Sequence, residues 1–187
     1  RSMILGLPEE ELVLPGNSSC AGCGGTLALR HTLKALGKRT IIVVPACCTS
    51  VIEGLYPKSA LNIPTLNTAF ASAAAAASGI AAALEARGTD DVTVLAWAGD
   101  GGTADIGIQA LSGAAERGTN FLYICYDNEA YMNTGIQRSS LTPLDSRTTT
   151  SPSGNVSWGN ITNKKDLPAI AAAHGVPYVA TTSVAYP

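Results

Sequence analysis

The chain has little charge of either sign, and the small excess is negative. Of its 187 residues, 12 are lysine or arginine and 14 are aspartate or glutamate, which gives a net charge of −2. Proteins that bind nucleic acid or an anionic membrane through their charge carry a basic excess, so neither partner is expected. Hydrophobic residues make up 46% of the chain, which is enough for the core of a single domain over residues 1–187.

Long hydrophobic runs are also scarce. The segment after Arg1 has no apolar core of about 7–15 residues, so we expect no secretory signal peptide. One nearly uncharged stretch, 69–84, is mostly alanine and has little of the leucine, isoleucine and phenylalanine content that drives membrane insertion. We interpret it as a buried helix at a sheet face or subunit interface, and we expect a cytoplasmic protein.

Histidine is rare. Its two occurrences are His31, in the middle of a predicted helix, and His174, at the end of another. Neither has a serine or cysteine nearby in the pattern of a nucleophile and its base, so a catalytic histidine is not expected.

The sequence does contain a regular alternation of strand and helix patterns. Apolar runs of strand length lie at 40–44, 92–98, 121–126 and 178–182, and helical patterns lie at about 25–36, 68–87, 104–117 and 167–174. This alternation predicts an α/β fold with a doubly wound, mostly parallel sheet. The polar stretch 139–163 has almost no apolar periodicity, and we interpret it as an ordered loop that covers the site, with a free tail as the alternative.

The most specific motif is Gly99-Asp100-Gly101-Gly102, together with Asn128 after the next predicted strand. Parallel strands joined by a helix bring their carboxyl ends to one edge of the sheet, where ligands of open α/β folds bind. Asp100 and Asn128 would there offer two oxygen ligands to Mg²⁺, and the glycines would admit a phosphate to the backbone. The motif therefore predicts a magnesium-diphosphate clamp. The alternative is a helix cap at Asp100 and a turn at Asn128.

This spacing resembles that of thiamine diphosphate (TPP) enzymes, and two more motifs narrow the resemblance. The run Tyr126-Asp127-Asn128-Glu129-Ala130-Tyr131-Met132-Asn133-Thr134-Gly135 and the run Cys20-Ala21-Gly22-Cys23-Gly24 resemble the beta subunits of 2-oxoacid:ferredoxin oxidoreductases, especially the pyruvate type. The resemblance extends from about Gly16 to the C-terminus. It implies the TPP-binding fold, with the Ala130 carbonyl as a third Mg²⁺ ligand. The residues then expected to line the diphosphate are Gly99, Gly101, Gly102 and Thr103.

The five cysteines form a second candidate site. Their close spacing suits metal or redox chemistry in a reducing compartment better than disulfides. The resemblance implies that Cys20, Cys23 and Cys48 hold a 4Fe–4S cluster near TPP, with a ligand loop at about 16–25. The family's fourth ligand lies beyond Pro187, so we expect a sequence truncated at its C-terminus; the alternative is a different fourth ligand, for which Cys47 is a candidate. Taken without the resemblance, the cysteines leave a zinc site or a dithiol redox pair open.

Two residues are candidates for contact with the cofactor ring or the substrate. Thr49 follows Cys48 at a predicted strand end. We expect both residues to face TPP; the alternative for Thr49 is a helix cap. Asn133 lies where the family positions a polar group over the reacting carbon, and there it would stabilise a carboxylate or developing oxyanion. The alternative is a turn residue before Gly135.

The resemblance implies a subunit of an enzyme that oxidatively decarboxylates a 2-oxoacid, passes electrons through the cluster to ferredoxin and delivers the acyl group to coenzyme A. Pyruvate or a branched-chain 2-oxoacid is favoured over 2-oxoglutarate. In this family an alpha-type subunit supplies the glutamate that activates TPP, and gamma- and delta-type subunits complete the complex, so we expect no activity from the chain alone. The alternatives are a TPP-dependent decarboxylase or synthase without a cluster, and a zinc-stabilised interaction module.

Overall fold

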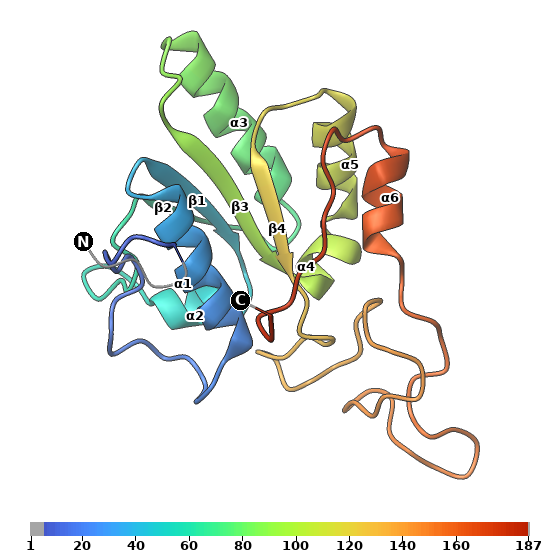
Figure 1. Ribbon diagram of the computed structural model, residues 1–187. Coiled ribbons are helices and arrows are strands. Elements are labelled where there is room, and N and C mark those ends of the chain that lie inside the picture. The colour runs from blue at the N-terminus through green and yellow to red at the C-terminus, as the bar shows by residue number, and fades with distance from the viewer. Residues whose placement is uncertain (1–5, 187) are drawn as a thin grey trace.

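The computed structural model describes residues 6–186, and residues 1–5 and 187 of the predicted domain lie outside this part (Figure 1). The helices are α1 (Gly24–Leu36), α2 (Cys48–Glu53), α3 (Ala73–Ala86), α4 (Asp100–Ala104), α5 (Ile108–Glu116) and α6 (Leu167–Ala173). The strands are β1 (Thr40–Pro45), β2 (Thr65–Thr68), β3 (Thr93–Gly99) and β4 (Leu122–Tyr126). They form one sheet in the order β2-β1-β3-β4, and every neighbouring pair is parallel. The predicted α/β fold with a parallel sheet is confirmed.

The two central strands are buried on both faces because helices cover both sides of the sheet (Figure 1). Ile42 and Leu95 pack into one hydrophobic cluster with Leu33 of α1. Val43, the neighbour of Ile42, points the other way and packs with Ala77 of α3. Successive strand residues alternate between faces, so a sheet covered twice requires the continuous apolar runs seen in the sequence.

The alanine-rich helix α3 lies against the sheet, as predicted for residues 69–84. Its buried residues are all small: Ala73, Ala74, Ala77 and Ser78. Small side chains let the helix contact β1, β3 and α5 closely. Within residues 6–186, no helix is both long enough and apolar enough to cross a membrane.

The helix predicted at 104–117 is present as α5 but begins later, at Ile108, and a separate short helix precedes it. The Gly-rich motif itself forms α4, and the backbone of Asp105 (φ −103°, ψ −94°) then leaves the helical region. The chain resumes as α5 after Gly107, whose position admits only glycine because a Cβ there would lie 1.9 Å from the Gly102 carbonyl oxygen. This close approach fixes α4 at the carboxyl end of β3.

Three further expectations were wrong or incomplete. Residues 178–182 form no strand: the segment pairs with none of the four strands of the sheet, and its residues are exposed. Helix α3 begins at Ala73 and not at residue 68, because Thr68 belongs to β2. The short elements α2 and β2 were not predicted at all.

Candidate functional site

The carboxyl ends of β3 and β4 lie side by side. Gly99 pairs in register with Tyr126, so Asp100 and Asn128 follow neighbouring strands at the same edge of the sheet. Asp100 begins α4 and is only 2% exposed. The structure thus brings together the two residues that the sequence predicted to meet.

A cluster of three oxygen-bearing groups forms at this edge. The inward-facing atom of the Asn128 amide lies 3.0 Å from Asp100 Oδ1 and 3.0 Å from the carbonyl oxygen of Ala130. With its nitrogen inward, the amide donates a hydrogen bond to each. With its oxygen inward, three oxygens face one another without a hydrogen between them, and Nδ2 instead lies 3.9 Å from Cys48 Sγ.

The second orientation suits a cation, because facing oxygens repel unless a positive charge lies between them. Mg²⁺ binds oxygen ligands octahedrally at about 2.0–2.1 Å, which places neighbouring ligands about 3.0 Å apart. The spacing of this cluster, defined by Asp100 Oδ1, the Asn128 amide and the Ala130 carbonyl and hereafter called the oxygen cluster, therefore fits a magnesium ion.

The carboxylate of Asp100 is held in a buried, charged surrounding. Burial raises its pKa to about 6, a hydrogen bond from Ser139 lowers it, and the charge of Asp127 raises it. The Ser139 hydroxyl lies 2.5 Å from Asp100 Oδ2, the oxygen that faces away from Asn128. Burial makes it costly to ionise this carboxylate, because the charged form loses its contact with water. A bound cation offsets that cost and stabilises the charged form.

A cavity of about 230 Å³ opens beside the oxygen cluster. It is lined by eight of the predicted residues, Cys48, Gly99, Asp100, Gly101, Gly102, Asn128, Ala130 and Asn133, and by Ala46, Cys47, Ser50, Phe70, Tyr126, Tyr131, Met132 and Thr134. A second groove, of about 280 Å³, lies beside α3 and α5 and contains none of the predicted residues; it is lined by Ala71, Ala75, Ile106, Gln109, Ala110, Gly113 and Arg117. We therefore place the candidate site in the first cavity.

Thr49 and Thr103 do not line this cavity. Thr49 is 4% exposed and accepts a hydrogen bond of 3.1 Å from the indole of Trp97. Thr103 is fully buried, donates to the Gly99 carbonyl at 2.7 Å and accepts from Tyr123 at 3.1 Å. Both hydroxyls thus stabilise the wall behind the cavity.

Tyr131 is a site residue that sequence reasoning missed. Its ring covers Gly101 so closely that a Cβ at Gly101 would lie 2.1 Å from Tyr131 Cε1. The ring packs edge-on against Phe70 with 5.9 Å between centroids, and its hydroxyl donates to Asp105 Oδ2 at 2.6 Å. No local pattern marks Tyr131 or Phe70, because their contact joins segments far apart in the chain.

The cysteines do not form a ready-made metal site in the part of the chain that the structure describes. No group of three or more Cys, His, Asp or Glu side chains is close enough there to hold a metal ion. Cys20 is exposed, while the half-buried Cys23 caps α1 by accepting the Thr26 N–H at 3.4 Å. Cys48 begins α2 inside the cavity, and burial, together with neighbouring Cys47, raises the pKa of its thiol.

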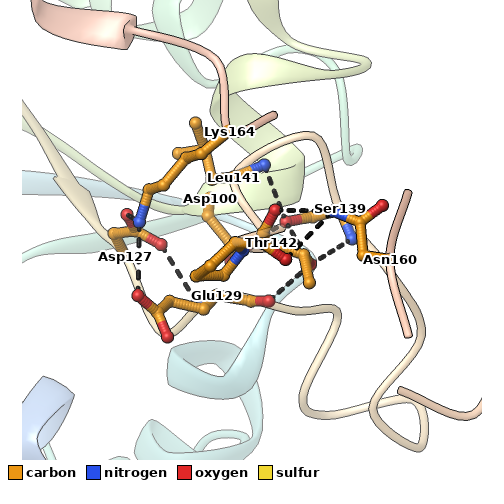
Figure 2. Close-up of polar contacts among 9 residues, drawn as sticks. Asp100, Asp127, Glu129, Ser139, Leu141, Thr142, Asn160 and Lys164 are labelled. Carbon is orange, nitrogen blue, oxygen red and sulfur yellow. Dashed lines mark hydrogen bonds and ion pairs between the residues drawn. The ribbon is translucent and has the colours of Figure 1, made fainter. Parts of the chain in front are cut away.

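The stretch 139–163 is irregular but hydrogen-bonded, and only its ends lie near the oxygen cluster. Figure 2 shows Ser139 beside Asp100, and Lys164 beside Asp127 and Glu129. The middle of the stretch extends away from the sheet (Figure 1), and Val156 is 99% exposed.

Comparisons with known proteins agree with this geometry. Residues 46–186 match the family described as "Thiamine pyrophosphate enzyme, C-terminal TPP binding domain". A pyruvate synthase subunit PorB of Methanothermobacter thermautotrophicus is 60% identical over 181 residues, which cover 97% of this chain and 63% of that protein. A ketoisovalerate oxidoreductase subunit VorB of Pyrococcus abyssi is 54% identical over 188 residues, which cover 98% of this chain and 60% of that protein.

A solved structure shares the fold. The 2-oxoglutarate:ferredoxin oxidoreductase from Magnetococcus marinus superposes with a TM-score of 0.69 at 22% identity, over 92% of this chain and 54% of that chain. This chain spans less than two thirds of the length of the relatives named above. Its parallel sheet and its match over residues 46–186 show that the chain belongs to the thiamine pyrophosphate enzymes, as a C-terminal TPP-binding domain.

Proposed function

We propose that this chain binds thiamine diphosphate through a magnesium ion held by Asp100, Asn128 and the Ala130 carbonyl. The observation that carries the proposal is the oxygen cluster beside the cavity, in which the Asn128 amide lies 3.0 Å from both Asp100 Oδ1 and the Ala130 carbonyl oxygen. Gly99, Gly101 and Gly102 line the same cavity at the start of α4, where backbone N–H groups would meet a diphosphate, as they do in phosphate-binding loops.

We propose further that the chain is part of a 2-oxoacid:ferredoxin oxidoreductase that acts on pyruvate or a branched-chain 2-oxoacid. Support comes from relatives named pyruvate synthase subunit PorB and ketoisovalerate oxidoreductase subunit VorB. When bound, TPP supplies the nucleophilic carbon and the electron sink for decarboxylation. Asn133 lines the same cavity, where its amide can donate to a substrate carboxylate or oxyanion.

Cys20, Cys23 and Cys48 are proposed as ligands of a 4Fe–4S cluster, with a fourth ligand outside the described residues. Hydrogen bonds to sulfur support this role: burial acts to raise the pKa of Cys23, yet the hydrogen bonds of Thr26 and Gly25 leave it below its usual value. At Cys48, where burial keeps the pKa of the thiol raised, hydrogen bonds from the Asn128 amide and the Asn133 backbone partly offset this effect. Such contacts stabilise the thiolate form that binds iron. Because Cys20 is exposed, the ligand loop would have to close around the cluster.

A partner is needed to complete the chemistry. The described lining of the cavity contains no glutamate, the residue that the resemblance assigns to the activation of TPP. We therefore propose an alpha-type subunit that supplies this glutamate, gamma- and delta-type subunits, ferredoxin as electron acceptor, and coenzyme A as acyl acceptor, in the cytoplasm.

Anaerobic purification followed by calorimetric titration with TPP and Mg²⁺ tests the first proposal. The wild-type protein should bind TPP only in the presence of Mg²⁺, and Asp100→Asn should bind at least about tenfold more weakly, because a metal ligand loses its charge. Asp145→Asn is a matched control, because Asp145 is exposed and its φ of 62° suits asparagine. Equal binding by the Asp100→Asn protein would contradict the proposed clamp.

The colour of the same purified protein tests whether it contains the proposed 4Fe–4S cluster. Brown protein with broad absorption and acid-labile sulfide supports the oxidoreductase. Colourless protein that still binds TPP supports a decarboxylase or synthase without a cluster, and colourless protein that contains zinc and binds no TPP supports an interaction module. Reduction of a viologen dye by the complex, screened over several 2-oxoacids, then identifies the substrate.

A further inference from the structure

Two buried hydroxyls at the start of the 139–163 stretch contact residues on both sides of the oxygen cluster, Asp100 and Glu129. Ser139 and Thr142 are each 1% exposed. Ser139 reaches Asp100 at the end of β3, and Thr142 reaches the peptide of Glu129 that follows β4 (Figure 2). The two residues also contact each other, since the Ser139 N–H donates to Thr142 Oγ1 at 2.9 Å.

The hydrogen bonds of Ser139 fix which way its hydroxyl donates. Ser139 Oγ accepts the N–H of Leu141 at 3.1 Å, so its own proton is free for Asp100 Oδ2 at 2.5 Å. This bond occupies the outer carboxylate oxygen and leaves Oδ1 directed toward Asn128. A ligand carboxylate held in this way loses less freedom when a metal binds.

The hydroxyl of Thr142 holds the backbone on the other side of the oxygen cluster, next to Ala130. It donates to the Glu129 carbonyl at 2.5 Å. Glu129 has a φ of 68°, a left-handed conformation that a residue with a side chain adopts only when its surroundings hold it. Because this residue directly precedes Ala130, the hydroxyl of Thr142 helps to set the direction of the Ala130 carbonyl.

The two hydroxyls are themselves held in place. The buried side chain of Asn160 donates to the Thr142 carbonyl at 2.8 Å and to the Pro143 carbonyl at 3.1 Å. Lys164, directly after the stretch, pairs with both Asp127 and Glu129 and reduces the repulsion among the acidic groups of this edge. The stretch is therefore anchored on both sides of the oxygen cluster.

We infer that Ser139 and Thr142 are positioning residues for the divalent cation of the diphosphate, acting through Asp100 and the Ala130 carbonyl. The inference rests on the proposed function, because it concerns the same metal site. It adds that this stretch, which no metal-binding motif marks, determines how strongly that site holds its ion.

Binding of Mn²⁺ in place of Mg²⁺, measured by electron paramagnetic resonance in the presence of excess TPP, tests the inference on the full-length protein. Ser139→Ala and Thr142→Val should weaken Mn²⁺ binding about tenfold or more, as loss of outer-shell hydrogen bonds does at other metal sites. Thr142→Ser keeps the hydroxyl and should bind within about twofold of the wild type. A change in the Mn²⁺ line shape should accompany the weaker binding, whereas a purely structural role would leave it unchanged.

Ser153→Ala is a matched control. It removes a hydroxyl that makes a hydrogen bond of the same length, 2.5 Å to the Trp158 carbonyl, in the same stretch but away from the oxygen cluster. It should bind Mn²⁺ like the wild type. If Ser139→Ala fails to fold, the comparison of Thr142→Val with Thr142→Ser decides.

The outcomes separate this inference from the function on which it rests. A wild-type protein that binds neither Mn²⁺ nor TPP overturns both. A wild-type protein that binds both, together with folded Ser139→Ala and Thr142→Val variants of unchanged affinity, overturns the inference alone. Weak binding by Thr142→Ser as well would also overturn it, because the hydroxyl would then not be the decisive group.

Discussion

At the scale of single residues, Gly101 and Tyr131 contact each other in the wall of the cavity. Tyr131 is held by Phe70 and by Asp105, and its ring occupies the space where any side chain at position 101 would begin. The absence of a Cβ at Gly101 therefore allows an aromatic residue to cover the backbone that we expect to contact the diphosphate.

Gly101→Ala should consequently displace Tyr131. The added Cβ would lie 2.1 Å from Tyr131 Cε1, so the ring must leave its contacts with Phe70 and Asp105. We expect the free energy of unfolding to fall by about 1–3 kcal/mol, as for other overpacked sites, and TPP binding to weaken. Urea denaturation and calorimetry measure the two effects. In the double variant Gly101→Ala/Tyr131→Ala the clash is absent, so part of the TPP affinity should return; no recovery would contradict this explanation.

Metal binding should depend on pH through Asp100. Its carboxyl has a pKa raised from 3.8 to about 6, so without metal the folded protein holds this proton more tightly than the unfolded chain. The contribution of this group to stability therefore decreases as the pH rises from 3.8 toward about 6. Metal binding has the opposite dependence, because protons compete with the cation for the carboxylate.

We expect the Mg²⁺ affinity to be nearly constant above about pH 7 and to fall up to tenfold per pH unit below about pH 6. Titrations with Mg²⁺ and TPP over this range measure the effect. The Asp100→Asn protein, which has no carboxyl to protonate at this position, should bind weakly and without the step near pH 6. A step that persists in this variant would assign the proton to another group.

At the scale of the secondary structure elements, the strands that are covered on both faces could be predicted from the sequence. β1, β3 and β4 were predicted because runs such as Val92–Ala98 are apolar, as strands covered on both faces must be. The edge strand β2 was missed because only four residues form it and Leu66 is 43% exposed. The opposite error occurred at 178–182, where an apolar run pairs with none of the described strands and stays exposed.

The residues of the candidate site also divide into those that the sequence predicts and those that it does not. Asp100 and Asn128 were found from sequence because each follows a strand directly, so topology alone brings them together. Ser139, Thr142 and Tyr131 were not, because their contacts depend on the path of irregular segments, which no periodicity encodes. Sequence therefore predicts the position of the oxygen cluster and leaves its supporting contacts to the structure.

Helix α3 offers a test of helix packing. Gly79 lies within α3 (Ala73–Ala86) and is exposed, and a Cβ at this position would meet no atom within 4 Å. Gly79→Ala should therefore raise the free energy of unfolding by roughly 0.5–1 kcal/mol, because alanine loses less backbone entropy in a helix. Thermal and urea unfolding of the isolated protein measure the change. A decrease would show that another part of the protein fills the space beside Gly79.

At the scale of the whole molecule, the described surface carries large exposed apolar side chains. They lie at several places in the described residues: for example, Leu55 and Tyr56 after α2 are 80% and 94% exposed, and Trp158 in the 139–163 stretch is 81% exposed. Exposed apolar groups of this size are common at protein interfaces. Together with a cavity whose described lining has no glutamate, they favour a chain that works beside a partner.

The purified chain, loaded with TPP and Mg²⁺, should therefore not reduce a viologen dye with any 2-oxoacid. Without a carboxylate against the aminopyrimidine ring, proton removal from the cofactor has no base within reach, and a missing acid–base group costs about 10²–10⁴-fold in rate. Addition of the alpha-type subunit should restore dye reduction. In that reconstituted complex, Asp145→Asn should remain fully active, whereas Asp100→Asn should lose activity because its metal site is impaired. Turnover by the chain alone would show that it contains its own activating group, and the proposed division of the active site between two subunits would be wrong.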